Sequence, residues 1–150
     1  MRQIKVVVLM VVAMLLMLPT IATAQNSMWH VDVMPAIDSE IHQVMDTATV
    51  EPAMCLGVDV DTATYRIVVW QMLPATEIGK RQTRDMTTFG CPQGAAMAHG
   101  HFLARGHEDG PSDVDLQAIK NLPSNVRPPV AIIIVANRMR DIHYVPYDVK

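Results

Sequence analysis

The alternation of apolar and polar residues predicts a helix followed by a pair of strands in the first half of the chain. Between residues 34 and 48 the apolar positions recur at helical spacing with polar side chains largely opposite, and Asp38 or Ser39 is suited to cap the start. The short apolar run "AMCLGVDV" at 53–60 and the β-branched and aromatic run "YRIVVWQML" at 65–73 are separated by a turn. This half is therefore expected to form an amphipathic helix and a β-hairpin.

The second half of the chain repeats the mixture of strand and helix patterns. Residues 74–90 form a polar connection without a clear period, with a short strand expected near 86–89. The remaining expected elements are a buried strand at 95–103, a loop at 104–111, a helix from residue 112 to about 121, and two pairing strands at 130–136 and 141–147. This order predicts an α/β (α+β) domain built on a mixed sheet, with one helix before the hairpin and one after the strand at 95–103.

The first 24 residues have the features of a secretory signal peptide. Arg2 and Lys5 precede an apolar run over 6–18, and Ala22-Thr23-Ala24 supplies a small-x-small cleavage pattern. A run of 13 apolar residues is short against the roughly 20 that span a bilayer. We therefore expect cleavage after residue 24, no stable membrane insertion, a secreted or periplasmic location, a loose lead-in segment at 25–33 and one domain at 34–150.

Charge and cysteine content narrow the class of protein further. The formal net charge of the 150-residue chain is −3, and loss of the two basic signal residues makes it more negative, which argues against nucleic acid as a partner. Cys55 and Cys91 form an even pair without a CxxC motif. In an exported chain such a pair predicts a disulfide rather than a redox centre.

Three histidines and four acids fall within residues 99–115, "HGHFLARGHEDGPSDVD". Residues i and i+2 of a strand share a face, so His99 and His101 can turn toward one metal ion, although an HxH pair is weak evidence by itself. Ser112 and Asp115 form a pattern close to a capping box, which needs no metal. The same helix start can also carry Asp115 as a third ligand and Ser112 as a hydroxyl in the site. Two histidines, an aspartate and a water would resemble a catalytic rather than a structural zinc site.

A hydrolytic zinc site also needs a general base that is not a ligand. Glu51, between the first helix and the strand at 53–60, is the candidate. Taken alone, this residue is more typical of a surface acid at a helix end.

Together these residues resemble the JAMM signature of the JAB/MPN metallopeptidases, here as an exported prokaryotic member. The resemblance covers roughly 34–147. The departures are Phe102 in place of the family's usual Pro, a loop of ten rather than seven residues before the Ser, and Pro52 after the Glu. The longer loop contains His107, which could replace one ligand or touch substrate, although a solvent-facing loop histidine is the simpler expectation. The motifs that carry the resemblance are Glu51 with "PAMCLGV", His99-Gly100-His101, and Pro111-Ser112-x-x-Asp115-Leu116.

The resemblance implies a JAB/MPN-like mixed sheet and a zinc-dependent amide hydrolase. His99, His101 and Asp115 would hold one Zn²⁺ per chain, Glu51 would accept a proton from a metal-activated water, and Ser112 would hydrogen-bond the oxyanion. The substrate would be a peptide or isopeptide, and the export signal favours a periplasmic peptide or a peptidoglycan stem peptide. A bridge between Cys55 and Cys91 would pin the strand of the base to the strand of the ligands.

Two other functions remain open from the residues. The chain could be a catalytically inactive JAB-like interaction module. It could also be a periplasmic protein that binds zinc or copper, because Met97, His99 and His101 alternate along one strand. Glu51 discriminates between these classes, since an enzyme needs this residue and a metal store or scaffold does not.

Overall fold

The computed structural model describes residues 28–77 and 89–150. The expected signal peptide, residues 25–27 of the lead-in and residues 86–88 of the short strand lie outside this part of the chain. Within it, no helix combines the length and apolar character needed to cross a membrane.

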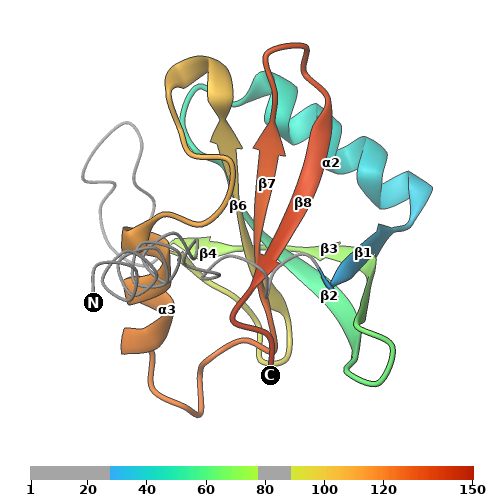
Figure 1. The fold of residues 1–150 in the computed structure, drawn as a ribbon, viewed down its shortest axis with the longest axis vertical. Helices are drawn as coiled ribbons and strands as arrows, with labels where there is room; N and C mark the ends of the chain where they lie inside the picture. Colours follow the sequence, from blue (N-terminus) through green and yellow to red (C-terminus); the bar gives the residue numbers. More distant parts are fainter. Residues whose placement is uncertain (1–27, 78–88) are drawn as a thin grey trace, which may run out of the picture.

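A six-stranded mixed sheet forms the centre of the molecule (Figure 1), with strand order β1-β3-β2-β6-β7-β8. β1 pairs with β3 and β6 pairs with β7 in parallel, and the other pairs are antiparallel. The predicted α+β class and both predicted hairpins are confirmed. The strands of this sheet are β1 (His30–Val33), β2 (Ala53–Asp61), β3 (Arg66–Leu73), β6 (Ala96–Phe102), β7 (Ala131–Ala136) and β8 (Ile142–Tyr147).

Two α-helices and three shorter elements complete the described fold. The first helix is α2 (Pro35–Thr47) and the second is α3 (Asp113–Asn121). A two-stranded sheet joins β4 (Thr76–Glu77) to β5 (Phe89–Gly90), and a 3₁₀ turn, η2 (Leu103–Arg105), follows β6.

The sheet has a separate hydrophobic cluster on each face. α2 packs on one face through Ile41 and Met45, whereas Ile119 of α3 belongs to the cluster on the other face (Figure 1). β7 supplies alternate residues to the two clusters and is buried along its whole length. A strand that is covered on both faces needs apolar residues at every position, and β7 has such a continuous apolar sequence, "AIIIVA".

The expectation of a loose lead-in is wrong for residues 30–33, which form β1. This strand lies parallel to β3, with His30 opposite Arg66 and Val33 opposite Val69. Val31 and Val33 pack against the cluster under α2. The strand is four residues long, too short to show a clear alternation, and its place at the edge of the sheet depends on β3, more than thirty residues later in the chain.

The expected cap of the first helix is also wrong. The helix begins at Pro35, with Met34 at the N-cap position and no side-chain capping bond. Proline is well suited to the first helical position because its fixed φ matches the helix and its missing N–H would be unpaired there. Asp38 instead accepts a hydrogen bond from the Tyr144 hydroxyl at 2.5 Å, which ties α2 to β8.

Candidate metal centre

β6 carries His99 and His101 on the face of the sheet that α3 covers. The Nε2 atoms of the two rings lie 3.2 Å apart. The side chain of His101 is 5% exposed and that of His99 is 15% exposed. The strand periodicity expected from the sequence therefore brings both imidazoles to one point.

Gly100 allows the chain to pack closely behind the two histidines. A Cβ at this position would lie 2.5 Å from the Met45 sulfur and 2.8 Å from the Pro52 ring. The Gly100 N–H also donates to the Pro52 carbonyl at 2.9 Å. A side chain at residue 100 would thus push away the segment that leads from α2 into β2.

The start of α3 brings a carboxylate to the histidines. Asp115 Oδ1 lies 3.0 Å from His99 Nε2, and Asp115 Oδ2 lies 3.6 Å from His101 Nε2. The predicted capping box is present: the Ser112 hydroxyl accepts from the Asp115 N–H, and the Asp115 carboxylate accepts from the Ser112 N–H. The Ser112 N–H fixes the carboxylate, the Asp115 N–H fixes the Ser112 hydroxyl, and together the two bonds leave the carboxylate beside the imidazoles.

The donor atoms of His99, His101 and Asp115 fit a divalent metal ion. They lie within 4.8 Å of one another, so the three side chains could hold a metal ion. Ligand atoms about 2.0–2.1 Å from a tetrahedral zinc ion lie roughly 3.3 Å apart. The two Nε2 atoms are 3.2 Å apart, and they lie 3.0 Å and 3.6 Å from different oxygens of Asp115. Two imidazoles and a carboxylate suit zinc and several other divalent transition ions.

His101 is held in the tautomer that a metal ligand needs. Its Nδ1 lies 3.0 Å from the Glu108 carbonyl oxygen, which can only accept, so Nδ1 carries the proton and Nε2 presents a lone pair. Burial lowers the pKa of His101, as do neighbouring His99 and His107, and these effects outweigh the Glu108 carbonyl and Asp115, which raise it. The ring is therefore neutral near pH 7.

Asp115 is held in its charged form. Burial alone would raise the pKa of this carboxyl, but the hydrogen bond and charge of His99 and the hydrogen bonds from Ser112 lower it to about 2. An ionised carboxylate beside a neutral imidazole is the combination that binds a divalent cation.

Glu51 lies beside the three candidate ligands but outside their set. Its Oε1 is 3.9 Å from His101 Nε2, and its side chain is 15% exposed. The pairing of β2 with β6 explains this position: Ala53 is opposite His99 and Pro52 bonds to Gly100, so the next residue back reaches His101. The structure thus brings the predicted base to the predicted ligands.

His107, whose part in the site the sequence leaves open, lies next to Glu51. It was expected to face solvent, but its side chain is 13% exposed, and its Nδ1 lies 3.6 Å from Glu51 Oε1. The Phe102 N–H donates to the same nitrogen at 3.0 Å, so the proton of the neutral ring is on Nε2. The length of the loop after His101 was the available signal, but length alone does not show which way a loop residue points.

The Ser112 hydroxyl has a partner within the cap. Its Oγ donates to Asp115 Oδ2 at 2.6 Å. Because a serine has one hydroxyl proton, Ser112 must turn away from Asp115 before it can donate to any other oxygen.

The predicted disulfide between Cys55 and Cys91 is present. It links β2 to the residue that directly follows β5. β2 is also the strand that pairs with β6 and follows Glu51, so the bridge stabilises the strand behind the site.

Met97 shares a face of β6 with the two histidines, but it packs against the cluster of Ile133 and Val135. This contact gives the methionine a role in the core.

Comparison with known proteins does not assign the chain to a family. No protein-family model matches the chain, and no curated protein matches it.

Proposed function

We propose that the protein is an exported, zinc-dependent hydrolase of the JAMM type that cleaves a peptide or isopeptide bond. The observation that carries the proposal is the position of Glu51, whose carboxylate lies next to a His-His-Asp set without belonging to it. A metal store needs ligands alone, whereas a hydrolase needs a base beside them. The order of elements supports the JAB/MPN assignment, because a helix, a hairpin, the HxH strand, a capped helix and a second hairpin follow one another as that family's pattern requires.

Each residue of the candidate site has a separate role in such a reaction. A zinc ion held by His99, His101 and Asp115 would supply Lewis-acid chemistry, lowering the pKa of a water and polarising the scissile carbonyl. Glu51 takes the proton from the attacking water and returns it to the leaving amine. The rigid start of α3 places the Ser112 hydroxyl beside the ligands. Ser112 turns this hydroxyl from Asp115 to the oxyanion and donates a hydrogen bond to it.

We further propose that the protein is exported and acts on a substrate outside the cytoplasm. The apolar run at 6–18 supports export, and the disulfide supports an oxidising compartment. A periplasmic peptide or a peptidoglycan stem peptide is the substrate class that such a location offers.

The proposal is tested by adding zinc-loaded protein to a mixture of peptides, isopeptides and stem peptides and following products by mass spectrometry. We expect cleavage by the wild-type protein and a loss of about 10²–10⁴-fold in Glu51→Gln, because a general base contributes that much. Glu40→Gln, a matched change of an exposed acid on α2, should keep full activity. Equal rates in the wild type and Glu51→Gln, or no cleavage of any amide, would leave the inactive module as the better account.

A further inference from the structure

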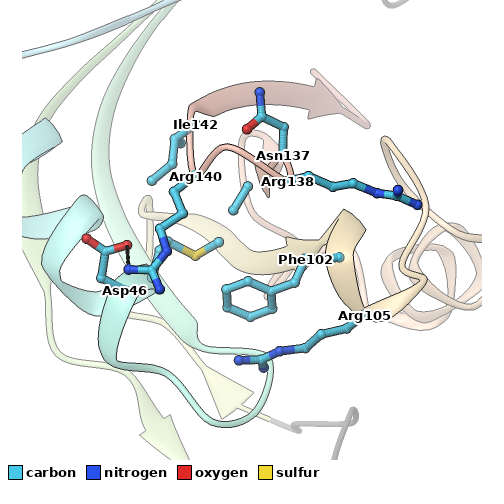
Figure 2. A pocket seen from close by; sticks show the side chains of 10 residues that line it. Asp46, Phe102, Arg105, Asn137, Arg138, Arg140 and Ile142 are labelled. Carbon is cyan, nitrogen blue, oxygen red and sulfur yellow. Dashed lines mark ion pairs between the residues drawn. The ribbon is translucent and has the colours of Figure 1, made fainter.

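A pocket of about 340 Å³ opens at the end of β6 and β7, on the face of the sheet that α2 covers. Its walls come from the last turn of α2, from η2 and from the turn between β7 and β8 (Figure 2). Phe102 lies on this face, whereas its neighbour His101 points to the opposite face. The pocket is therefore separate from the metal centre.

The lining of the pocket combines an apolar floor with a positively charged rim. Met45, Phe102, Ala136 and Ile142 supply the apolar surface. Figure 2 shows Arg105 beside the Phe102 ring and Arg140 next to Asp46, the single carboxylate of the lining, whereas the side chain of Arg138 extends outward from the rim. Three positive charges against one negative charge stand out in a chain whose net charge is −3. The arginines are Arg105, Arg138 and Arg140.

The three arginines differ in how far contacts within the protein already engage them. Arg105 is fixed, since its guanidinium lies 4.0 Å above the centre of the Phe102 ring and donates to the Ala48 carbonyl at 2.8 Å. Arg140 makes a long ion pair with Asp46, 4.0 Å between Nη1 and Oδ1. Arg138 makes no ion pair within residues 28–77 and 89–150. An anion in the pocket would lie near the positive charges of this rim, which attract it.

We propose that this pocket binds an organic anion that joins a carboxylate to an apolar group, such as the C-terminal residue of a peptide. The guanidinium fork matches a carboxylate in two parallel hydrogen bonds. The apolar floor distinguishes an organic ligand from a free inorganic anion, which remains hydrated and gains nothing from Phe102 or Ile142. The proposal depends neither on a metal ion nor on amide hydrolysis.

Four probes separate the carboxylate from the apolar group: N-acetyl-leucine, N-acetyl-leucine amide, acetate and inorganic phosphate. Each is titrated into the purified protein at low ionic strength and followed through the backbone amide resonances of the Arg105 and Arg140 segments. N-acetyl-leucine is expected to bind at least about tenfold more tightly than the amide, because a charge-assisted pair is lost. It should also bind more tightly than acetate and phosphate. Equal binding of acid and amide, tighter binding of phosphate, or no saturable shift would overturn the proposal.

Three substitutions in the protein test the same binding of N-acetyl-leucine. Arg138→Gln should weaken N-acetyl-leucine binding by about fivefold, and Asp46→Asn should strengthen it, because the competing carboxylate is gone. Lys120→Gln removes the same charge from an exposed position on α3 and should change nothing. An equal loss in Lys120→Gln and Arg138→Gln would mean that net charge alone attracts the anion, and the proposal would fail. Unchanged melting temperatures show that each variant is folded.

Discussion

His101 and Asp115 stand in the protonation states that bind a divalent cation. The Glu108 carbonyl holds the proton of His101 on Nδ1, and His99 and Ser112 keep the Asp115 carboxylate charged. Each effect comes from a contact that the fold supplies, a loop carbonyl in one case and a helix cap in the other. Two of the three candidate ligands are thus in the protonation state that a cation needs.

The lowered pKa of Asp115 predicts acid sensitivity of the metal-free protein. A carboxyl with a pKa of about 2 in the folded state and an ordinary value near 3.9 when unfolded binds fewer protons when folded. Its stabilising effect is present above about pH 4 and is lost as the pH falls to 2, with a total of about 2 kcal/mol. Urea unfolding in the presence of a chelator at several pH values measures this slope.

The matched variants are Asp115→Asn and Asp113→Asn, both in the first turn of α3. The first should flatten the dependence of the unfolding free energy on pH between 4 and 2, and the second, at an exposed position, should leave it in place. The same slope in Asp115→Asn as in the wild type would show that other carboxyls cause the acid sensitivity.

At the scale of elements, the site is assembled where β2, β6 and α3 meet. β6 turns the histidines to one face, its pairing with β2 brings Glu51 alongside, and the capped start of α3 presents Asp115. Gly100 is the point of closest packing in this arrangement, because Met45 and Pro52 occupy the space of its missing side chain.

Gly100→Ala is therefore expected to destabilise the protein by about 1–3 kcal/mol, as overpacking of a buried position does. The Met45 sulfur can move, but the Pro52 ring is held by its place between Glu51 and β2. Thermal unfolding of the metal-free protein measures the loss. A melting temperature equal to that of the wild type would show that the segment from α2 to β2 moves away at no cost.

Strong local patterns allowed most of the elements and four members of the site to be predicted from the sequence. The HxH alternation and the Ser112-x-x-Asp115 cap are local, and the structure confirms the shared face and the capping box. β1 could not be predicted, because four residues beside β3 owe their conformation to a distant partner. The inward position of His107 could not be predicted for the same kind of reason: the Phe102 N–H donates to its ring, and that contact does not follow from the local pattern.

At the scale of the whole molecule, the two faces of one sheet carry two different sites at the same end. The candidate metal centre lies on the α3 face and the arginine-lined pocket lies on the α2 face, and η2 with its following loop borders both. Arg105 of η2 lines the pocket, and the loop residue Glu108 supplies the carbonyl that orients His101. The Cys55–Cys91 bridge anchors the middle of this sheet.

Removal of that bridge should lower the free energy of unfolding by about 3–4 kcal/mol, the value expected from closing a loop with a sequence separation of 36. Urea unfolding of oxidised and reduced protein measures the difference. The variant Cys55→Ala/Cys91→Ala should unfold identically with and without reductant. If reduction changes the wild type by less than 1 kcal/mol, the segment around β4 and β5 is held by other contacts.

We propose that His99, His101 and Asp115 bind a zinc ion while Glu51 does not. Metal content by mass spectrometry on purified protein supplied with zinc tests it most directly. We expect about one zinc per chain in the wild type and in Glu51→Gln, and almost none in His99→Ala/His101→Ala, because two of three ligands are gone. A wild-type protein that stays empty in excess zinc, or a double variant that binds zinc as well as the wild type, would show that these residues are not zinc ligands.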